Sequence, residues 1–265
     1  MIIDFHTHCF PDKLAARAVQ RLSDAGGGLM HYADGTLEGL RQQMTQHNID
    51  LSVVLNIATK PEQQTNVNNF AATIDKEPDI IAFGSVFPGA PDAFEELERI
   101  KELGLKGVKF HPEYQQFGID EPRMFPIYDY ALSKGLMLIF HAGHDPAFDP
   151  PWHSSPKRFA DVYKTLGGGT IICAHLGGIN QWDEVEQYLV GTGIYLDTSM
   201  GLDYYSHEQF LRIVKAHGAD KILFGSDSPW SEAGKEKDTI LSLSLTDEEK
   251  NLILCDNAKR LLGIK

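Results

Sequence analysis

The sequence predicts an α/β fold, a single-domain (β/α)8 barrel of the TIM-barrel type, from three observations. Eight short apolar runs alternate with eight segments of helical spacing. Most of the runs are nearly continuous in apolar and β-branched residues, as expected of parallel strands that are covered on both faces. A length of 265 residues suits one such barrel, and no linker, internal repeat or low-complexity tract divides the chain. We therefore treat residues 1–265 as one domain.

The predicted strands are, in order, Ile2–His8, Leu51–Ala58, Ile80–Phe87, Leu105–His111, Leu136–Ala142, Thr170–His175, Gly193–Thr198 and Lys221–Asp227. The predicted helices are Leu37–Gln46, Gln63–Lys76, Asp92–Leu103, Phe125–Lys134, Lys157–Leu166, Asp183–Val190, His207–His217 and about Glu248–Leu262. An irregular excursion is expected over Leu22–Gly35. An open, doubly wound sheet is the alternative, but no Gly-rich phosphate loop follows the first strand.

Local signals mark several of the helix ends. Ser206-x-x-Gln209 and Thr246-x-x-Glu249 are capping-box patterns, whose side chains satisfy free N–H groups of a first turn. Gly104 and Gly218 stand just past predicted helices, where a left-handed cap is favoured.

Composition excludes several classes of protein. The formal net charge is 24 − 37 = −13 with no basic stripe, which argues against nucleic acid as a partner. No apolar run approaches about 18 residues, so membrane insertion is not expected. Charged residues follow the N-terminus too soon for a secretion signal, which favours a cytoplasmic location. Three well-separated cysteines form no C-x-x-C pair and suggest neither a disulfide framework nor a zinc knuckle.

Polar residues gather at the carboxyl ends of the predicted strands, where a barrel forms its active site. His6 and His8 are two residues apart, which places both imidazoles on one face of a strand. His141 ends the fifth strand and Asp227 the eighth. Two or three histidines with a carboxylate are typical of a catalytic zinc site, and the oxygen ligand also suits manganese or iron. A purely structural role for these groups would bury many polar atoms, each costing about 1–3 kcal/mol if left without a partner.

The roles of other polar and aromatic residues are less specific. Histidines outside the strands are expected to be solvated surface residues, namely His31, His47, His153, His207 and His217. The stretch from His144 to Ser155 reads either as a lid over the barrel mouth or as an inert surface loop. Four residues after strand ends either line a substrate wall or pack on the rim, namely Tyr114, Trp152, Met200 and Trp230.

Several motifs together resemble the amidohydrolase superfamily, and in particular the amidohydrolase-related group that includes aminocarboxymuconate-semialdehyde decarboxylase. These motifs are Asp4-Phe5-His6-Thr7-His8, Gly107-Val108-Lys109-Phe110-His111-Pro112, His141-Ala142-Gly143, Ala174-His175-Leu176-Gly177-Gly178, Phe224-Gly225-Ser226-Asp227-Ser228-Pro229 and Asp256-Asn257-Ala258-x-Arg260-Leu261-Leu262-Gly263. They occur in order from residue 2 to residue 263.

The resemblance implies one divalent metal ion, usually zinc, held by His6, His8, His141 and Asp227. His175 would lie beside the catalytic water. In two-metal branches a carboxylated lysine on the fourth strand bridges the ions, and Lys109 lies on that strand. The pattern Lys109-x-His111-Pro112 is more typical of the single-metal branch, however, so the resemblance makes a second metal ion the less favoured alternative.

We therefore expect a metal-dependent hydrolase acting on a small carbonyl compound, such as a lactone or amide, through a metal-activated water. Asp227 would act as general base, and His175 would orient the water or polarise the carbonyl. Substrate-binding roles are expected for Lys109, His111 and His144. The small-molecule substrate is the expected partner, and a homo-oligomer is left open.

Three alternatives remain. The first is a decarboxylase (a carboxy-lyase) that releases carbon dioxide from a small carboxylic acid at the same metal site. The second is a phosphoesterase of the polymerase-histidinol-phosphatase type, and the third is a metal-binding protein without catalytic activity.

Overall fold

The computed structural model describes residues 1–202 and 204–264, and within them strands and helices alternate along the chain. The strands are β1 Ile3–Thr7, β2 Leu51–Leu55, β3 Ile80–Phe83, β4 Gly107–Phe110, β5 Met137–Phe140, β6 Ile171–Cys173, β7 Tyr195–Asp197 and β8 Ile222–Leu223. The α-helices are α1 Asp12–Ala25, α2 Leu37–His47, α3 Gln64–Ile74, α4 Ala93–Glu102, α5 Pro112–Gln115, α6 Phe125–Ser133, α7 Pro156–Leu166, α8 Trp182–Tyr188, α9 His207–His217, α10 Ala233–Ser242, α11 Asp247–Asn251 and α12 Asn257–Leu262.

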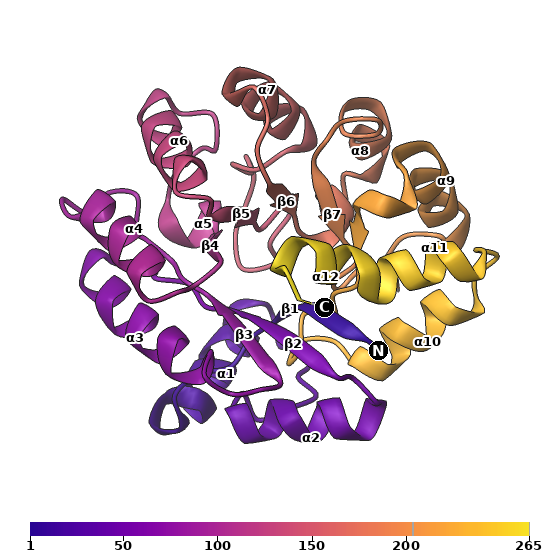
Figure 1. The fold of residues 1–265 in the computed structure, drawn as a ribbon, viewed down its shortest axis with the longest axis horizontal. Coiled ribbons are helices and arrows are strands. Elements are labelled where there is room, and N and C mark those ends of the chain that lie inside the picture. Colours follow the sequence, from indigo (N-terminus) through magenta and orange to yellow (C-terminus); the bar gives the residue numbers. More distant parts are fainter. Residues whose placement is uncertain (203, 265) are drawn as a thin grey trace.

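The strands are all parallel and run in chain order around a ring. Regular pairing gives β1-β2-β3 and β4-β5-β6-β7-β8. The β3–β4 junction is joined by hydrogen bonds from Gly84 N to Gly107 O (2.9 Å) and from Lys109 N to Gly84 O (2.8 Å). Beyond β8, Phe5 N donates to Phe224 O at 2.7 Å. The helices surround this ring (Figure 1), which confirms the predicted barrel.

Two apolar layers hold the barrel together. One lies between strands and helices, and the other fills the interior with side chains such as Phe5, Val53 and Ile139. Cys255, Ala258 and Leu262 from the C-terminal segment belong to the interior cluster, so this segment closes the end where the strands begin. Figure 1 shows both termini at that end. The polar residues lie at the opposite end of the barrel, where the strands finish.

The elements differ from prediction mainly where sequence signals are weak. Helix α1 was not predicted; Pro11 precedes it without a side-chain cap, and the irregular excursion begins at Gly26 and not at Leu22. Helices α5 and α10 were also missed. The predicted C-terminal helix is interrupted by a π-helical turn, η5, over Leu252–Asp256. Among the described residues, no helix has both the length and the apolar character that a membrane crossing requires.

The two predicted capping boxes form to different extents. Thr246 and Glu249 form the full reciprocal pair at the start of α11. Ser206 accepts a hydrogen bond from Gln209 N, but the Gln209 side chain donates to Asp183 and Glu186 instead of returning to the cap.

Candidate metal centre

Strand β1 contains a bulge between Asp4 and Thr7, which includes His6, and His8 follows directly after the strand. Asp4 lies opposite Ser52 and Thr7 opposite Val54, so three steps along β1 face two steps along β2. An inserted residue of this kind shifts the alternation of side chains between the two faces of a strand. Phe5 packs in the barrel interior, and the His6 ring also points inward. The bulge therefore brings His6 and His8 to the mouth of the barrel.

Three potential ligand atoms converge at this mouth. His6 Nε2 lies 3.2 Å from His8 Nε2 and 3.3 Å from Asp227 Oδ1, and His8 Nε2 lies 2.9 Å from the same oxygen. The Nδ1 atoms of the two rings are held elsewhere, that of His6 by Asp197 Oδ2 (2.8 Å) and that of His8 by Leu55 O (2.7 Å). Such partners fix a histidine with Nε2 available to a metal. The donor set fits a divalent ion.

The turn after β8 carries Asp227 to this position. Asp227 adopts a left-handed backbone conformation with φ of +69°, and its N–H donates to His6 O at 2.8 Å. Gly225 lies against β1 so closely that a Cβ atom there would stand 2.8 Å from the Cβ of His6. The absence of a side chain at residue 225 thus allows the turn to pack against His6.

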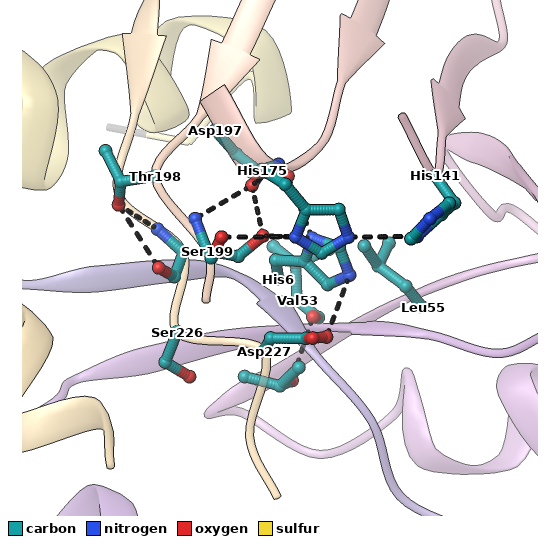
Figure 2. A network of polar contacts seen from close by, with 12 residues as sticks. His6, Val53, Leu55, His141, His175, Asp197, Thr198, Ser199, Ser226 and Asp227 are labelled. Atoms are coloured by element: carbon teal, nitrogen blue, oxygen red, sulfur yellow. Dashed lines mark hydrogen bonds and ion pairs between the residues drawn. The ribbon is translucent and has the colours of Figure 1, made fainter. Parts of the chain in front are cut away.

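His141 and His175 form a neighbouring pair, seen in Figure 2 together with His6 and Asp227. His175 Nε2 lies 3.0 Å from His141 Nδ1, and the His175 ring lies 5.3 Å from that of His6. His141 is not grouped with the three converging donors, although its Nε2 is buried and has no hydrogen-bond partner among the described residues. The structure brings His141 to the same end of the barrel, and its role as fourth ligand stays a prediction.

A second group of potential ligands consists of His111, His141 and Asp145. His111 Nε2 lies 3.2 Å from Asp145 Oδ2, and its Nδ1 accepts a long hydrogen bond from Tyr114 N at 3.5 Å. The rings of His111 and His141 are stacked at 4.2 Å and 12°. The nitrogen lone pair of an imidazole lies in the plane of its ring. Because the His111 and His141 rings lie in nearly parallel, separate planes, a single ion cannot lie in the planes of both rings. This geometry favours a hydrogen-bonded His111–Asp145 pair over a second metal ion.

The three predicted substrate-binding residues lie at different distances from the converging donors. Lys109 is 1% exposed, and its Nζ lies 3.2 Å from His6 Nε2. His111 belongs to the second group described above. His144 lies further out, where its Nδ1 is 3.0 Å from Asn180 Nδ2 and its ring contacts Trp152. Only Lys109 of the three directly contacts the converging donors.

The protonation states at neutral pH suit metal binding. Burial lowers the pKa of His6 to about 4, with the Lys109 charge acting in the same direction and Asp197 and Asp227 acting against it. Burial alone would raise the pKa of Asp227, but His6 and His8 more than offset it, and the pKa lies well below its usual value. Burial lowers the pKa of Lys109 to about 8, although Asp197 and Asp227 oppose this shift. A neutral imidazole and an ionised carboxylate are the forms that bind metals.

Two buried acids support this site without having been assigned roles from the sequence. Asp197 Oδ1 accepts hydrogen bonds from His175 N (3.1 Å) and Ser199 N (3.0 Å), while its other oxygen holds His6. Asp4 accepts from Ser226 N and Ser226 Oγ, and burial raises the pKa of Asp4 to about 7. The position of Asp197 at a strand end was a usable signal, and Asp4 opens the motif Asp4-Phe5-His6-Thr7-His8, which marked this residue without giving it a role.

The fold and the site together define a class of protein, a TIM-barrel protein with histidine and aspartate side chains at the strand ends that could hold a divalent metal ion. The chain belongs to the amidohydrolase family, since the family model described as Amidohydrolase matches residues 3–264. It is accordingly an enzyme of the amidohydrolase superfamily.

Solved structures show the same fold at low sequence identity. An uncharacterised TIM-barrel protein from Bordetella bronchiseptica has a TM-score of 0.78 at 21% identity, covering 99% of this chain and 98% of the other. A dihydroxybenzoic acid decarboxylase from a Polaromonas species, with bound manganese, has a TM-score of 0.72 at 17% identity, covering 99% and 96%. A probable 2-pyrone-4,6-dicarboxylic acid hydrolase from Acinetobacter baumannii has a TM-score of 0.67 at 18% identity, and the match covers 99% of each chain.

Proposed function

We propose that this enzyme hydrolyses a C–O or C–N bond of a small carbonyl compound, such as a lactone or an amide. One observation carries the proposal. The ligand atoms of His6, His8 and Asp227 converge at the mouth of the barrel, and the buried Lys109 amino group lies 3.2 Å from one of them. This combination offers a cation site and a fixed positive charge side by side.

Zinc is the first choice of metal, with manganese and iron as alternatives, and a divalent ion would supply a water of lowered pKa and polarise the substrate carbonyl. His6, His8 and Asp227 would hold it, with His141 as the proposed fourth ligand. The chemistry of the donor set supports this, because two neutral imidazoles and a carboxylate are the ligands of many catalytic zinc sites.

The protein's own groups have distinct proposed roles. The attacking water adds its oxygen to the carbonyl carbon, and its proton passes to the carboxylate of Asp227. Asp227 then delivers that proton to the leaving oxygen or nitrogen as the C–O or C–N bond breaks. His175 is held by Ser199 O at 3.1 Å and by His141, and burial lowers its pKa, so a neutral ring is available to orient the water.

Decarboxylation of a small carboxylic acid is the second candidate, and the buried Lys109 ammonium is compatible with it because it could hold an acid substrate at the same site. A cation beside the converging donors would hold the carboxylate of an acid substrate, whether that group is lost or merely recognised. The family match gives no support to the phosphoesterase alternative.

The test is an assay of purified protein loaded with zinc, manganese or iron, on a panel of lactones, amides and aromatic carboxylic acids. We expect a hydrolytic product without carbon dioxide, and loss of turnover with a chelator. Asp227→Asn should lower the rate at least about 10²-fold while leaving the protein folded. Release of carbon dioxide would show that the enzyme is a decarboxylase and not a hydrolase. Full activity of Asp227→Asn would overturn the assigned role of Asp227.

A further inference from the structure

The carboxylate of Asp4 lies at the junction of the two segments that provide the converging ligand atoms. Asp4 is 1% exposed and follows Ile3 in β1, just before the bulge. Its Oδ1 accepts a hydrogen bond from His6 N at 3.2 Å, within the same strand. The backbone amide of the bulge therefore has a carboxylate partner.

The same carboxylate holds the turn after β8. Asp4 Oδ1 accepts from Ser226 N at 2.9 Å, and Asp4 Oδ2 accepts from Ser226 Oγ at 2.6 Å. Ser226 Oγ in turn accepts from Ser228 N at 2.9 Å. The amides on both sides of Asp227 are thus fixed by one carboxylate–hydroxyl pair.

This arrangement matters because Asp227 sits in a left-handed conformation, which is uncommon for residues with a side chain and which the contacts on both sides of it hold in place. The turn also borders β1 through the hydrogen bond from Asp227 N to His6 O at 2.8 Å. A shift of either segment would change the separation between His6 Nε2 and Asp227 Oδ1.

We propose that Asp4 is a positioning residue of the metal centre, which sets the spacing of His6, His8 and Asp227 by joining the β1 bulge to the Ser226–Ser228 turn. Asp4 does not itself contact the converging ligand atoms, so it acts through the backbone that carries them. The inference rests on the proposed function in one respect, that these three residues bind a divalent ion.

Two variants test it. Asp4→Asn keeps the shape and one acceptor oxygen but replaces an acceptor of the Ser226 hydroxyl by an NH2 group, and Ser226→Ala removes the hydroxyl itself. Each metal-free protein is titrated with Co²⁺, which reports ligand geometry through its visible absorption, with a competing chelator to fix the affinity. We expect both variants to bind Co²⁺ roughly 10–100-fold more weakly, with an altered spectrum.

Asp75→Asn is the matched control. Asp75 is a half-buried carboxylate whose Oδ1 accepts from Ala82 N at 2.7 Å, remote from the site. Its substitution should lower stability to urea without changing the Co²⁺ affinity or spectrum. If Asp4→Asn does not fold, Ser226→Ala carries the test.

Three outcomes would count against the inference. Wild-type Co²⁺ affinity and spectrum in Asp4→Asn, or in Ser226→Ala where Asp4→Asn does not fold, would overturn the positioning role alone. An equal loss in Asp75→Asn would show that general destabilisation is responsible. Failure of the wild-type protein to bind Co²⁺, Zn²⁺ or Mn²⁺ would overturn the proposed function and the inference together.

Discussion

Lys109 Nζ lies 3.2 Å from His6 Nε2, so a buried ammonium group stands directly beside a predicted metal ligand. The charge is balanced by two buried carboxylates, since Asp197 and Asp227 both raise the pKa of Lys109 against the effect of burial. Burial still brings that pKa down to about 8, which leaves most of the group protonated at pH 7. The site thus contains a cation of its own that is available to an anionic part of a substrate.

The first prediction concerns this cation. Lys109→Met keeps the length and apolar stem of the side chain but removes its charge. We expect kcat/KM to fall by at least about tenfold for a substrate that carries a carboxylate, because a charge-assisted hydrogen bond contributes about 1.5–3 kcal/mol. The matching uncharged methyl ester should be affected less. The measurement is the ratio of kcat/KM for acid and ester.

Lys106→Met is the control for that comparison, because Lys106 is exposed just before β4 begins, at the other end of the same strand. An acid-to-ester ratio that is unchanged in Lys109→Met, or lowered equally in Lys106→Met, contradicts the assignment.

The second prediction concerns Asp197, whose Oδ2 holds His6 Nδ1 at 2.8 Å. Asp197→Asn leaves a side chain of the same shape but without the negative charge that orients and polarises the ring. Zinc affinity should fall roughly 10–100-fold, as is usual for the hydrogen-bond partners of metal-binding histidines. Equilibrium competition with a chromophoric chelator gives the affinity. An unchanged value would mean that His6 is oriented by other contacts.

The third prediction concerns metal removal. A ligand that binds the folded chain stabilises it by about 2.7 kcal/mol when its concentration is 100 times its dissociation constant. Urea unfolding with and without saturating zinc should show an increment of this order in the wild-type protein. His8→Ala removes one of the three converging donors, so its increment should be much smaller. Equal increments in the two proteins would place the zinc elsewhere.

The fourth prediction concerns pH and His217, which was expected to be a solvated surface residue. That expectation was wrong: His217 is buried, with its Nε2 donating to Ile194 O at 2.9 Å and its Nδ1 accepting from Gly191 N at 3.2 Å. Burial lowers its pKa below the ordinary value of 6.5. Because the unfolded chain takes up the proton first, His217 contributes stability above pH 6.5 that is lost as pH falls through its folded-state pKa.

Urea unfolding at pH 7.5 and pH 5 checks this prediction. His217→Gln should reduce the difference between the two pH values, since glutamine does not titrate. His207→Gln is the matched control, because His207 is exposed at the start of the same helix, α9, and its replacement should leave the difference unchanged. A pH difference in His217→Gln equal to that of the wild type would contradict the assignment.

Much of the fold could be predicted because local sequence patterns indicate most of the strands and helices of the barrel. Apolar runs of strand length alternate with helical spacing, and burial on both faces requires little else of a parallel strand. Helix α1 escaped prediction although its buried residues Ala15, Val19 and Ser23 recur at helical spacing, and β8 extends over Ile222–Leu223 only, far less than its apolar run suggested.

By itself the sequence determined which residues meet at the barrel mouth. The carboxyl ends of the parallel strands converge there, and the sequence shows which of these ends carry polar side chains. His6, His8, Lys109 and Asp227 follow from that rule. Only the tertiary structure decided how they are aimed. The bulge that brings His6 inward, and the Asp4–Ser226 contact between residues 222 positions apart, depend on pairings across the barrel. Such contacts leave no trace in the spacing of neighbouring residues, because they join segments that become adjacent only when the ring closes.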